Sequence, residues 1–217
     1  MKYAINNLPK EIPLFPLPGP LLLPKSKLPL NLFEPKYLTM LNDVLKTEDR
    51  LIGMIQPVST PEGRTGSRQL HQIGCAGRVV SFNETKDGRY LITLEGISRY
   101  RFKSISEGFF PYTKGNVSWE SFSEDLEKTK PDQNFNRVEF LDILSKYFAA
   151  AQLSSDWSSL KEADEELLIN SLSMLCPFDP EEKQALLEAP SLEYRRETLV
   201  TLMEFNLQGG IDEETLQ

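Results

Sequence analysis

Apolar and polar positions alternate with a period of two along much of the first half of the chain, which is the pattern of β-strands. Residues 75–102 hold the clearest example, because Asp87-Gly88 separates two alternating runs as the turn of a tight hairpin does. Shorter strands are predicted over residues 11–17, 27–33, 50–58 and 109–119. Prolines in the first two confine them to sheet edges or irregular strands.

The second run of the hairpin has one apolar and one basic face. Arg99, Arg101 and Lys103 share one parity, which we expect to point into water. Gly96 has the other parity but adds no bulk there, which predicts a bend or a close backbone approach. The residues predicted to point inward with it are Tyr90, Ile92, Leu94, Tyr100 and Phe102.

Strand gives way to helix within the sequence Phe33-Glu34-Pro35-Lys36-Tyr37. Pro35 suits the first turn of a helix, where its missing N–H would have no partner. Glu34 places a carboxylate at the positive end of that helix, so we interpret it as a capping residue rather than a catalytic acid. The apolar stripe that follows is formed by Tyr37, Leu41, Val44 and Leu45.

Beyond residue 135 the apolar positions recur at helical spacing. Asp179-Pro180 predicts a helix start, Ser159 and Glu162 can form a capping box, and Ser191 can cap the final helix. Four helices joined by short turns predict a small bundle. The apolar positions that suggest the first and last helices are Val138, Leu141, Leu144, Phe148 and Ala151, and then Leu199, Leu202 and Met203.

Periodicity is lost over residues 120–134, which we therefore predict to be a linker. It separates a β subdomain at residues 1–119, for which the resemblance given below implies a barrel, from a helical subdomain at residues 135–217. Charge changes at the same place: residues 1–118 hold 16 Lys and Arg against 10 Asp and Glu, whereas residues 119–217 hold 8 against 22. This asymmetry indicates either two units with different surfaces or solvated acidic helix faces.

The apolar fraction of 40% is that of an ordinary globular protein. Its longest apolar stretch, residues 12–24, is interrupted by prolines and so fits neither a signal peptide nor a membrane span. We therefore expect a cytoplasmic protein. Cys75 and Cys176 are isolated and flanked by apolar residues, which favours buried free thiols over a disulfide.

Several phrases occur in a characteristic order: IPLFPL, FEPKY, RLIGM, IGCAGRVVSF, DGRYLITLEGISRYRF and PFDPEEKQALLEAPSLEYRRETLVTLME. Together, over roughly residues 10–208, they make the chain resemble the N-terminal substrate-binding domain of Lon proteases, above all its stand-alone bacterial version. The resemblance implies an α+β fold, a PUA-like six-stranded β pseudobarrel with one helix followed by a four-helix bundle. In full-length Lon this domain is linked to substrate recognition and oligomer assembly, and the related domain of cereblon serves protein contacts.

Enzyme chemistry finds little support in the residues. The sequence lacks any Gly-Lys dipeptide and hence a Walker A loop, and no segment matches the Lon peptidase. His71 is the only histidine, so His-rich metal sites are excluded and a catalytic pair would have to recruit this residue beside the 59–70 loop. We expect no enzyme, no metal and no cofactor.

The leading hypothesis is a non-enzymatic module that binds unfolded polypeptide or a protein partner, as a monomer or weak homodimer. Pro-broken strands leave sheet edges that can accept a peptide, and long loops concentrate contacts. Candidate contacts are Arg64 and Arg68 of the 59–70 loop, and Phe109 and Phe110. Adjacent strand residues face opposite ways, so one phenylalanine can be exposed, although core packing of both is the commoner outcome.

Two other functions stay open at this point. The face of Arg99, Arg101 and Lys103 could bind RNA, as some PUA-like barrels do, but the acidic half would repel phosphates unless turned away. We favour the alternative that these cations pair with the acidic helices. A small-molecule pocket between barrel and bundle ranks last, because no residue specifically supports it.

Overall fold

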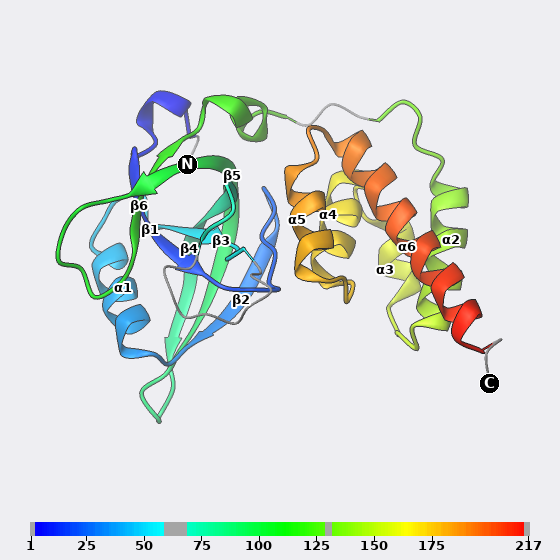
Figure 1. Ribbon diagram of the computed structural model, residues 1–217, viewed down its shortest axis with the longest axis horizontal. Helices are drawn as coiled ribbons and strands as arrows, with labels where there is room; N and C mark the ends of the chain where they lie inside the picture. Colours follow the sequence, from blue (N-terminus) through cyan, green and yellow to red (C-terminus); the bar gives the residue numbers. More distant parts are fainter. Residues whose placement is uncertain (1–2, 59–68, 129–131, 215–217) are drawn as a thin grey trace. The chain divides into compact units, whose positions relative to one another are not determined.

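The computed structural model describes residues 3–58, 69–128 and 132–214 (Figure 1). The chain divides into two compact units, residues 1–128 and 129–217, and each is described by itself. The first unit contains six strands, one α-helix and two short 3-10 helices among its described residues, and the second is helical. The predicted α+β class is confirmed.

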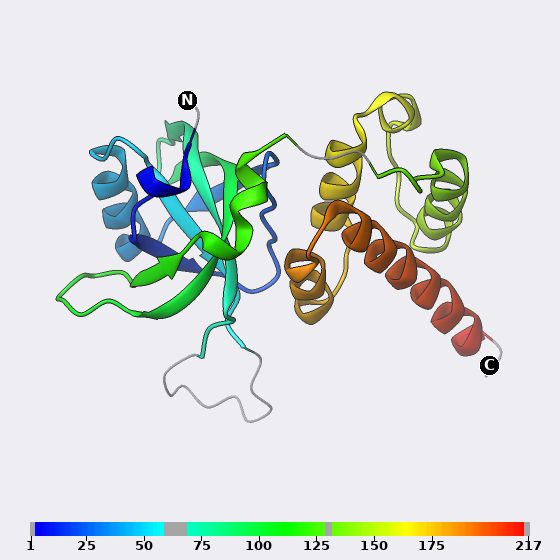
Figure 2. The same ribbon diagram turned by 90° about the horizontal axis from the view of Figure 1, so that it is seen from above.

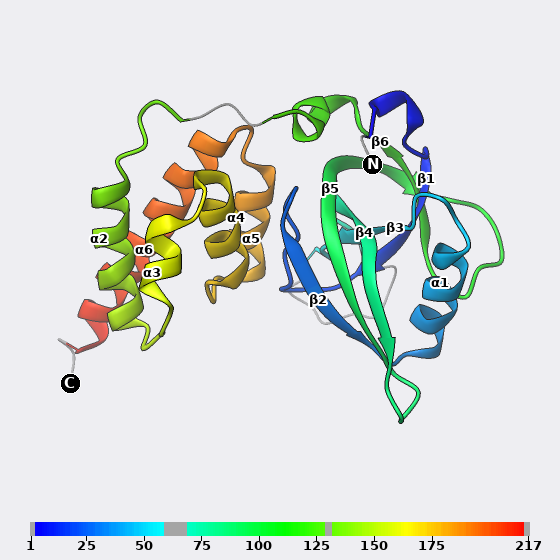
Figure 3. The ribbon, with the colours of Figure 1, turned by 180° about the vertical axis from the view of Figure 1, so that it is seen from behind.

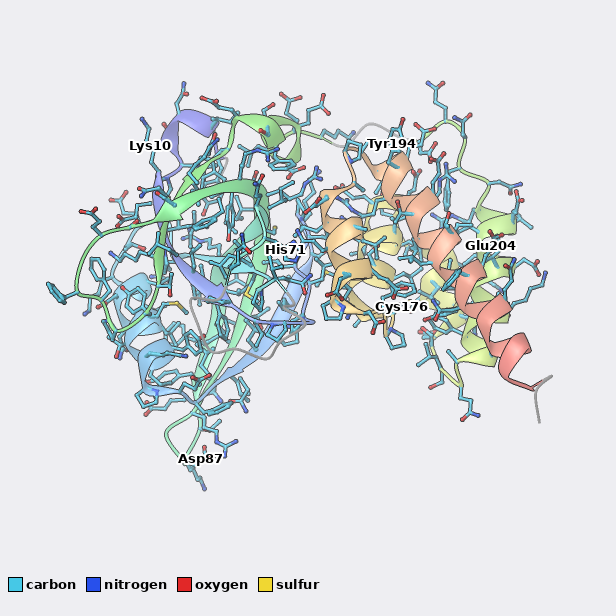
Figure 4. All side chains as sticks on the ribbon, viewed as in Figure 1. Lys10, His71, Asp87, Cys176, Tyr194 and Glu204 are labelled. Carbon is cyan, nitrogen blue, oxygen red and sulfur yellow. The ribbon has the colours of Figure 1, made fainter. Side chains whose placement is uncertain are left out.

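Six strands form one mixed sheet in the first unit: β1 (Glu11–Pro16), β2 (Lys27–Leu32), β3 (Leu51–Ile55), β4 (Ile73–Glu84), β5 (Tyr90–Ile105) and β6 (Lys114–Ser118). Their order is β2-β5-β4-β3-β1-β6, and β5 also pairs with β6. The long β5 strand thereby closes a ring of five strands with its second half and pairs with β2 through its first half (Figure 3). Only the pairing of β1 with β3 is parallel. The predicted hairpin is confirmed, with Asp87 in the turn at its tip (Figure 4).

Tyr100 fills the centre of this barrel. Its side chain is fully buried, its hydroxyl donates to the Met54 carbonyl at 3.0 Å, and its ring lies 5.8 Å from that of Trp119. Gly74 makes the space, because a Cβ there would lie only 2.5 Å from the Tyr100 hydroxyl oxygen. Burial raises the pKa of Tyr100 well above its ordinary value, so the phenol stays protonated and can donate.

The close approach predicted at Gly96 is confirmed. A Cβ at this position would overlap the Leu23 carbonyl, because the segment before β2 crosses directly over β5. The Gly96 N–H donates to the Ser26 carbonyl, and the Lys25 N–H donates to the Gly96 carbonyl, both at 2.8 Å. The β4–β5 register also shifts beside it, between Ala76 and Gly77.

Helix α1 (Pro35–Leu45) begins at the predicted proline. Glu34 is the N-cap residue, but the predicted capping by its carboxylate is wrong, because its side chain makes no cap hydrogen bond. Its carbonyl accepts the first hydrogen bonds of the helix, from the Tyr37 and Leu38 N–H groups. The carboxylate instead pairs with Lys36 at 2.9 Å. The Tyr37 ring packs 4.2 Å from that of Phe15 and joins the helix to the barrel.

Residues 120–126, which we predicted to lie in a linker, form the 3-10 helix η2 (Glu120–Leu126) on the barrel. A buried ion pair holds it, because Arg99 donates from Nε and Nη2 to the two carboxylate oxygens of Asp125 at 2.9 and 2.8 Å. The Phe122 ring lies 4.5 Å from the same guanidinium. The linker interpretation missed this contact because it depends on a residue of β5 distant in sequence.

The second unit contains five helices in its described residues, one more than predicted: α2 (Arg137–Ala150), α3 (Trp157–Glu162), α4 (Glu165–Leu175), α5 (Pro180–Glu188) and α6 (Leu192–Glu214). The extra helix is α3, capped by Asp156, whose side chain accepts from the Ser158 and Ser159 N–H groups. The predicted capping box at Ser159 is wrong, since Ser159 lies inside α3. Asp164 caps α4 instead, by accepting from the Glu166 N–H at 3.0 Å.

The other helix-end predictions in this unit are confirmed. Asp179 and Glu182 form a capping box at α5, with the Asp179 N–H donating to Glu182 at 2.8 Å. Ser191 accepts from the Tyr194 N–H at the start of α6. The stripe predicted for α2 is confirmed at Leu144 and Phe148, which are buried. It is wrong at Val138, which is 80% exposed, while Phe140 and Tyr147 join the core. The C-terminal end of the predicted linker also makes a tertiary contact, because Asp132 pairs with Arg196 of α6 at 2.6 Å.

Candidate functional site

The loop between β5 and β6 carries the two adjacent phenylalanines, and we call residues 106–113 the aromatic loop. Phe109 has a relative exposure of 110%, so its side chain contacts almost nothing, and Phe110 is 43% exposed. The expectation that both belong to a strand and pack in the core is wrong. Strand β6 begins only at Lys114, and Gly108 turns the chain with a φ of 143°.

Phe110 stabilises the loop through contacts with other residues of the same segment. A Cβ at position 108 would lie 2.6 Å from the Phe110 ring, so this ring packs directly on Gly108. On its other flank the Lys114 ammonium lies 4.0 Å from the ring centroid, within the range of a cation–π contact. Lys114 is itself held by Glu11 at 3.5 Å. The neighbouring Phe109 is thus presented on a supported backbone.

Tyr112 anchors the loop to α1, beside which the loop runs in Figures 1 and 2. Its buried hydroxyl donates to Asp43 Oδ2 at 3.1 Å. Burial and the Asp43 carboxylate raise the pKa of Tyr112 to about 12, so the phenol keeps its proton at neutral pH. Backbone bonds close the loop ends, with the Ser106 N–H donating to the Lys114 carbonyl and the Leu14 N–H to the Thr113 carbonyl.

An exposed aromatic ring on a loop whose backbone is held by its neighbours is suited to binding apolar side chains. Phenylalanine buries a large apolar surface when it is covered, and a pre-ordered backbone loses little conformational entropy on binding. Ile105, the last residue of β5, is 53% exposed and adds apolar surface at the start of this loop. The loop therefore presents exposed apolar surface at Phe109 and Ile105.

A second group of exposed apolar residues lies along β2 and the hairpin. Phe33, which we treated only as part of the strand-to-helix junction, is 62% exposed, and the Arg89 guanidinium lies 5.8 Å from its ring. Leu91 is 48% exposed and pairs with Asn31 of β2. Sequence reasoning missed this group, although its signal was an apolar residue on the outward parity of β5.

The three basic residues predicted to share one exposed face of β5 differ in their exposure. Arg99 is only 5% exposed and forms the buried pair with Asp125, so it cannot contact a phosphate. Arg101 donates to Gln72 at 3.3 Å, and Lys103 is exposed. The expected partner of Arg99 was an acidic residue of the helical half, whereas the observed partner lies in residues 1–128.

The described residues offer no cluster of metal ligands, and both cysteine thiols are buried. No group of three His, Cys, Asp or Glu side chains that could hold a metal is found among them. Cys75 and Cys176 are buried free thiols, as predicted, and burial raises the pKa of Cys176 to about 12, which disfavours the thiolate. Arg64 and Arg68 lie outside the described residues. No described helix is long and apolar enough to cross a bilayer.

Comparison with solved structures shows where this fold occurs. The N-terminal domain of a Mycobacterium avium complex Lon protease covers 90% of this chain and 98% of its own, with a TM-score of 0.62 and 13% identity. A Lon N-terminal domain protein from Xanthomonas campestris covers 88% of this chain and 97% of its own, with a TM-score of 0.58 and 22% identity.

Sequence relatives point the same way. The chain is 29% identical over 119 residues to Lon protease 2 of Sorangium cellulosum, which covers 54% of this chain and 15% of the relative. It is 23% identical over 203 residues to Lon protease 2 of Myxococcus xanthus, or 91% of this chain and 24% of the relative. The chain thus spans a quarter or less of the length of these relatives. The family described as the ATP-dependent protease La (LON) substrate-binding domain matches residues 11–204, and this chain belongs to that family.

Proposed function

We propose that this chain binds unfolded or extended polypeptide through the aromatic loop, without chemical turnover. The observation that carries the proposal is Phe109, a fully exposed ring on a loop braced by Phe110, Lys114 and Tyr112. An isolated apolar residue on a surface is common, but aromatic residues, phenylalanine among them, are enriched at protein interfaces.

The family supports the same proposal, because its description names substrate binding and its relatives are Lon proteases. Polypeptides are the substrates that a protease domain of this kind would meet. We do not propose RNA binding, because Arg99, one of the three basic residues that suggested it, is buried against Asp125.

The test is a fluorescence-anisotropy titration of a labelled, permanently unfolded protein, reduced and carboxymethylated α-lactalbumin. We expect saturable binding by the wild-type chain and a Kd at least about fivefold higher for Phe109→Ala, because truncating a binding hot spot costs more than ~1 kcal/mol. The matched control is Phe205→Ala on α6, which removes a ring that is 69% exposed in the other unit. This control should leave Kd unchanged.

Neither variant should change the melting temperature, because both rings are largely exposed. Equal Kd values for the wild type and Phe109→Ala would remove the aromatic loop from the binding site. An absence of binding by the wild-type chain would reject the proposed function itself.

A further inference from the structure

We infer that the outer edge of β2 is a strand-addition site, at which the main chain of a bound polypeptide pairs as a further strand. This inference rests on the proposed function and names a binding mode for it. The occupant is an extended polypeptide segment, because alternating N–H and C=O groups recognise a main chain whatever its side chains are. That is the property required of a receptor for unfolded chains.

The register of β2 shows which main-chain groups point outward. The Gly96 N–H donates to the Ser26 carbonyl, and β2 pairs with β5 from Lys27 opposite Glu95 to Leu32 opposite Tyr90. In an antiparallel ladder, hydrogen-bonded and non-hydrogen-bonded pairs alternate. Residues 28, 30 and 32 therefore bond to β5, whereas the N–H and C=O groups of residues 27, 29 and 31 point away from it.

The position of Pro29 supports this assignment of outward and inward main-chain groups independently. Pro29 has no N–H, and proline within a sheet is confined to positions whose N–H would face outward at an edge. The outer edge consequently offers two donors, the N–H groups of Lys27 and Asn31, and three acceptors, the carbonyls of residues 27, 29 and 31. Within the described part of the chain, no strand pairs with this edge.

The exposure of the residues along β2 alternates with the same period of two. Lys27, Pro29 and Asn31, whose main-chain groups point outward, are all exposed, and Leu28 and Leu30 are half-buried. A strand added here would place alternate side chains beside Leu28 and Leu30 on one face, and beside Pro29, Asn31 and Phe33 on the other. The edge should therefore favour segments with apolar residues at alternate positions.

The charge at the start of this edge adds a further preference. Lys27 is exposed there, and the acidic residue paired opposite it, Glu95, is half-buried in β5. A segment that carries a carboxylate beside its apolar residues complements this end of β2. The carboxymethylated α-lactalbumin probe supplies both kinds of group, since its cysteines carry added carboxylates.

A matched pair of variants separates the main chain of Asn31 from its side chain. Asn31→Pro removes the outward N–H and places a ring where the added strand would lie, while leaving the bonds to β5 intact. Asn31→Ala removes the side chain but keeps the N–H. We expect Asn31→Pro to raise Kd for the probe about fivefold or more, as the loss of one hydrogen bond and a steric block predict, and Asn31→Ala to leave it within about twofold.

Hydrogen exchange provides a readout that needs no substitution. Binding of the same probe to the wild-type chain should slow exchange of the Lys27 and Asn31 amides about fivefold or more, because these are the donors the added strand would use. This measurement decides the question if Asn31→Pro fails to fold.

The outcomes distinguish this inference from the proposed function. If the wild-type chain binds the probe but Asn31→Pro and Asn31→Ala bind equally well, the β2 edge is not the site and the proposed function stands. Unchanged exchange at Lys27 and Asn31 on saturation would overturn the inference in the same way. Failure of the wild-type chain to bind would reject the proposed function, and with it the inference.

Discussion

At the scale of single residues, Tyr112 ties the aromatic loop to α1 through its hydrogen bond to Asp43. The folded state holds its phenolic proton to a pKa of about 12, against an ordinary value of 10.0, chiefly because the ring is buried. Between these values the unfolded chain releases a proton that the folded chain keeps. The free energy of unfolding should therefore fall as pH rises from about 10 to about 12.

Comparison of the wild type with Tyr112→Phe measures this effect. Denaturant unfolding across that pH range should show a shallower decline for the variant, because one proton-retaining group is gone. Some decline should remain, since burial also raises the pKa of Tyr147 to about 12. Identical slopes would show that Tyr112 ionises alike in the folded and unfolded chains.

At the scale of elements, a buried ion pair contributes to the attachment of η2 to the barrel. The side chains of Arg99 and Asp125 are 6% and 8% exposed, and the carboxylate also accepts from the Arg99 N–H at 2.9 Å. Removing one member of a buried pair leaves the other charge desolvated without that neutralising group. Asp125→Ala should accordingly lower the free energy of unfolding by about 3–5 kcal/mol.

Tryptophan fluorescence can assign this loss to the correct unit. In a Trp157→Phe background, the buried Trp119, whose indole N–H donates to the Pro9 carbonyl, reports on the barrel alone. The control is Glu120→Ala, an exposed acidic residue in the first turn of η2, and it should change stability by less than about 0.5 kcal/mol. Equal effects of the two substitutions would contradict a structural role for the ion pair.

At the scale of the whole molecule, the barrel carries a hydrophobic core made entirely from its own unit. The cluster around Tyr100 joins Leu8, residues of the strands and Trp119, all within residues 1–128. Such a core should fold without the helices. We expect a fragment of residues 1–128 to unfold cooperatively and to keep the buried fluorescence of Trp119, and a non-cooperative transition would contradict this.

Much of the local structure could be predicted from the sequence because its causes are local. Pro35 and Asp179-Pro180 start helices wherever the chain places them, and Asp87-Gly88 turns a hairpin by its own backbone preference. Gly96 signalled a close approach by lacking bulk at an inward position, and the structure places the Leu23 carbonyl there. The family and the α+β class could likewise be predicted from several short sequence segments that occur in a characteristic order.

What the sequence by itself determined was therefore the set of strands, the starts of α1, α5 and α6, and the family. Tertiary structure alone decided which side chains are free to bind. Arg99 reads as a solvent-facing cation until Asp125, 26 residues later, is folded against it. Phe109 could be either a core residue or an exposed contact until β6 is seen to begin after it. Alternation along a strand reports two faces but not what covers them, because coverage depends on contacts between residues far apart in the chain.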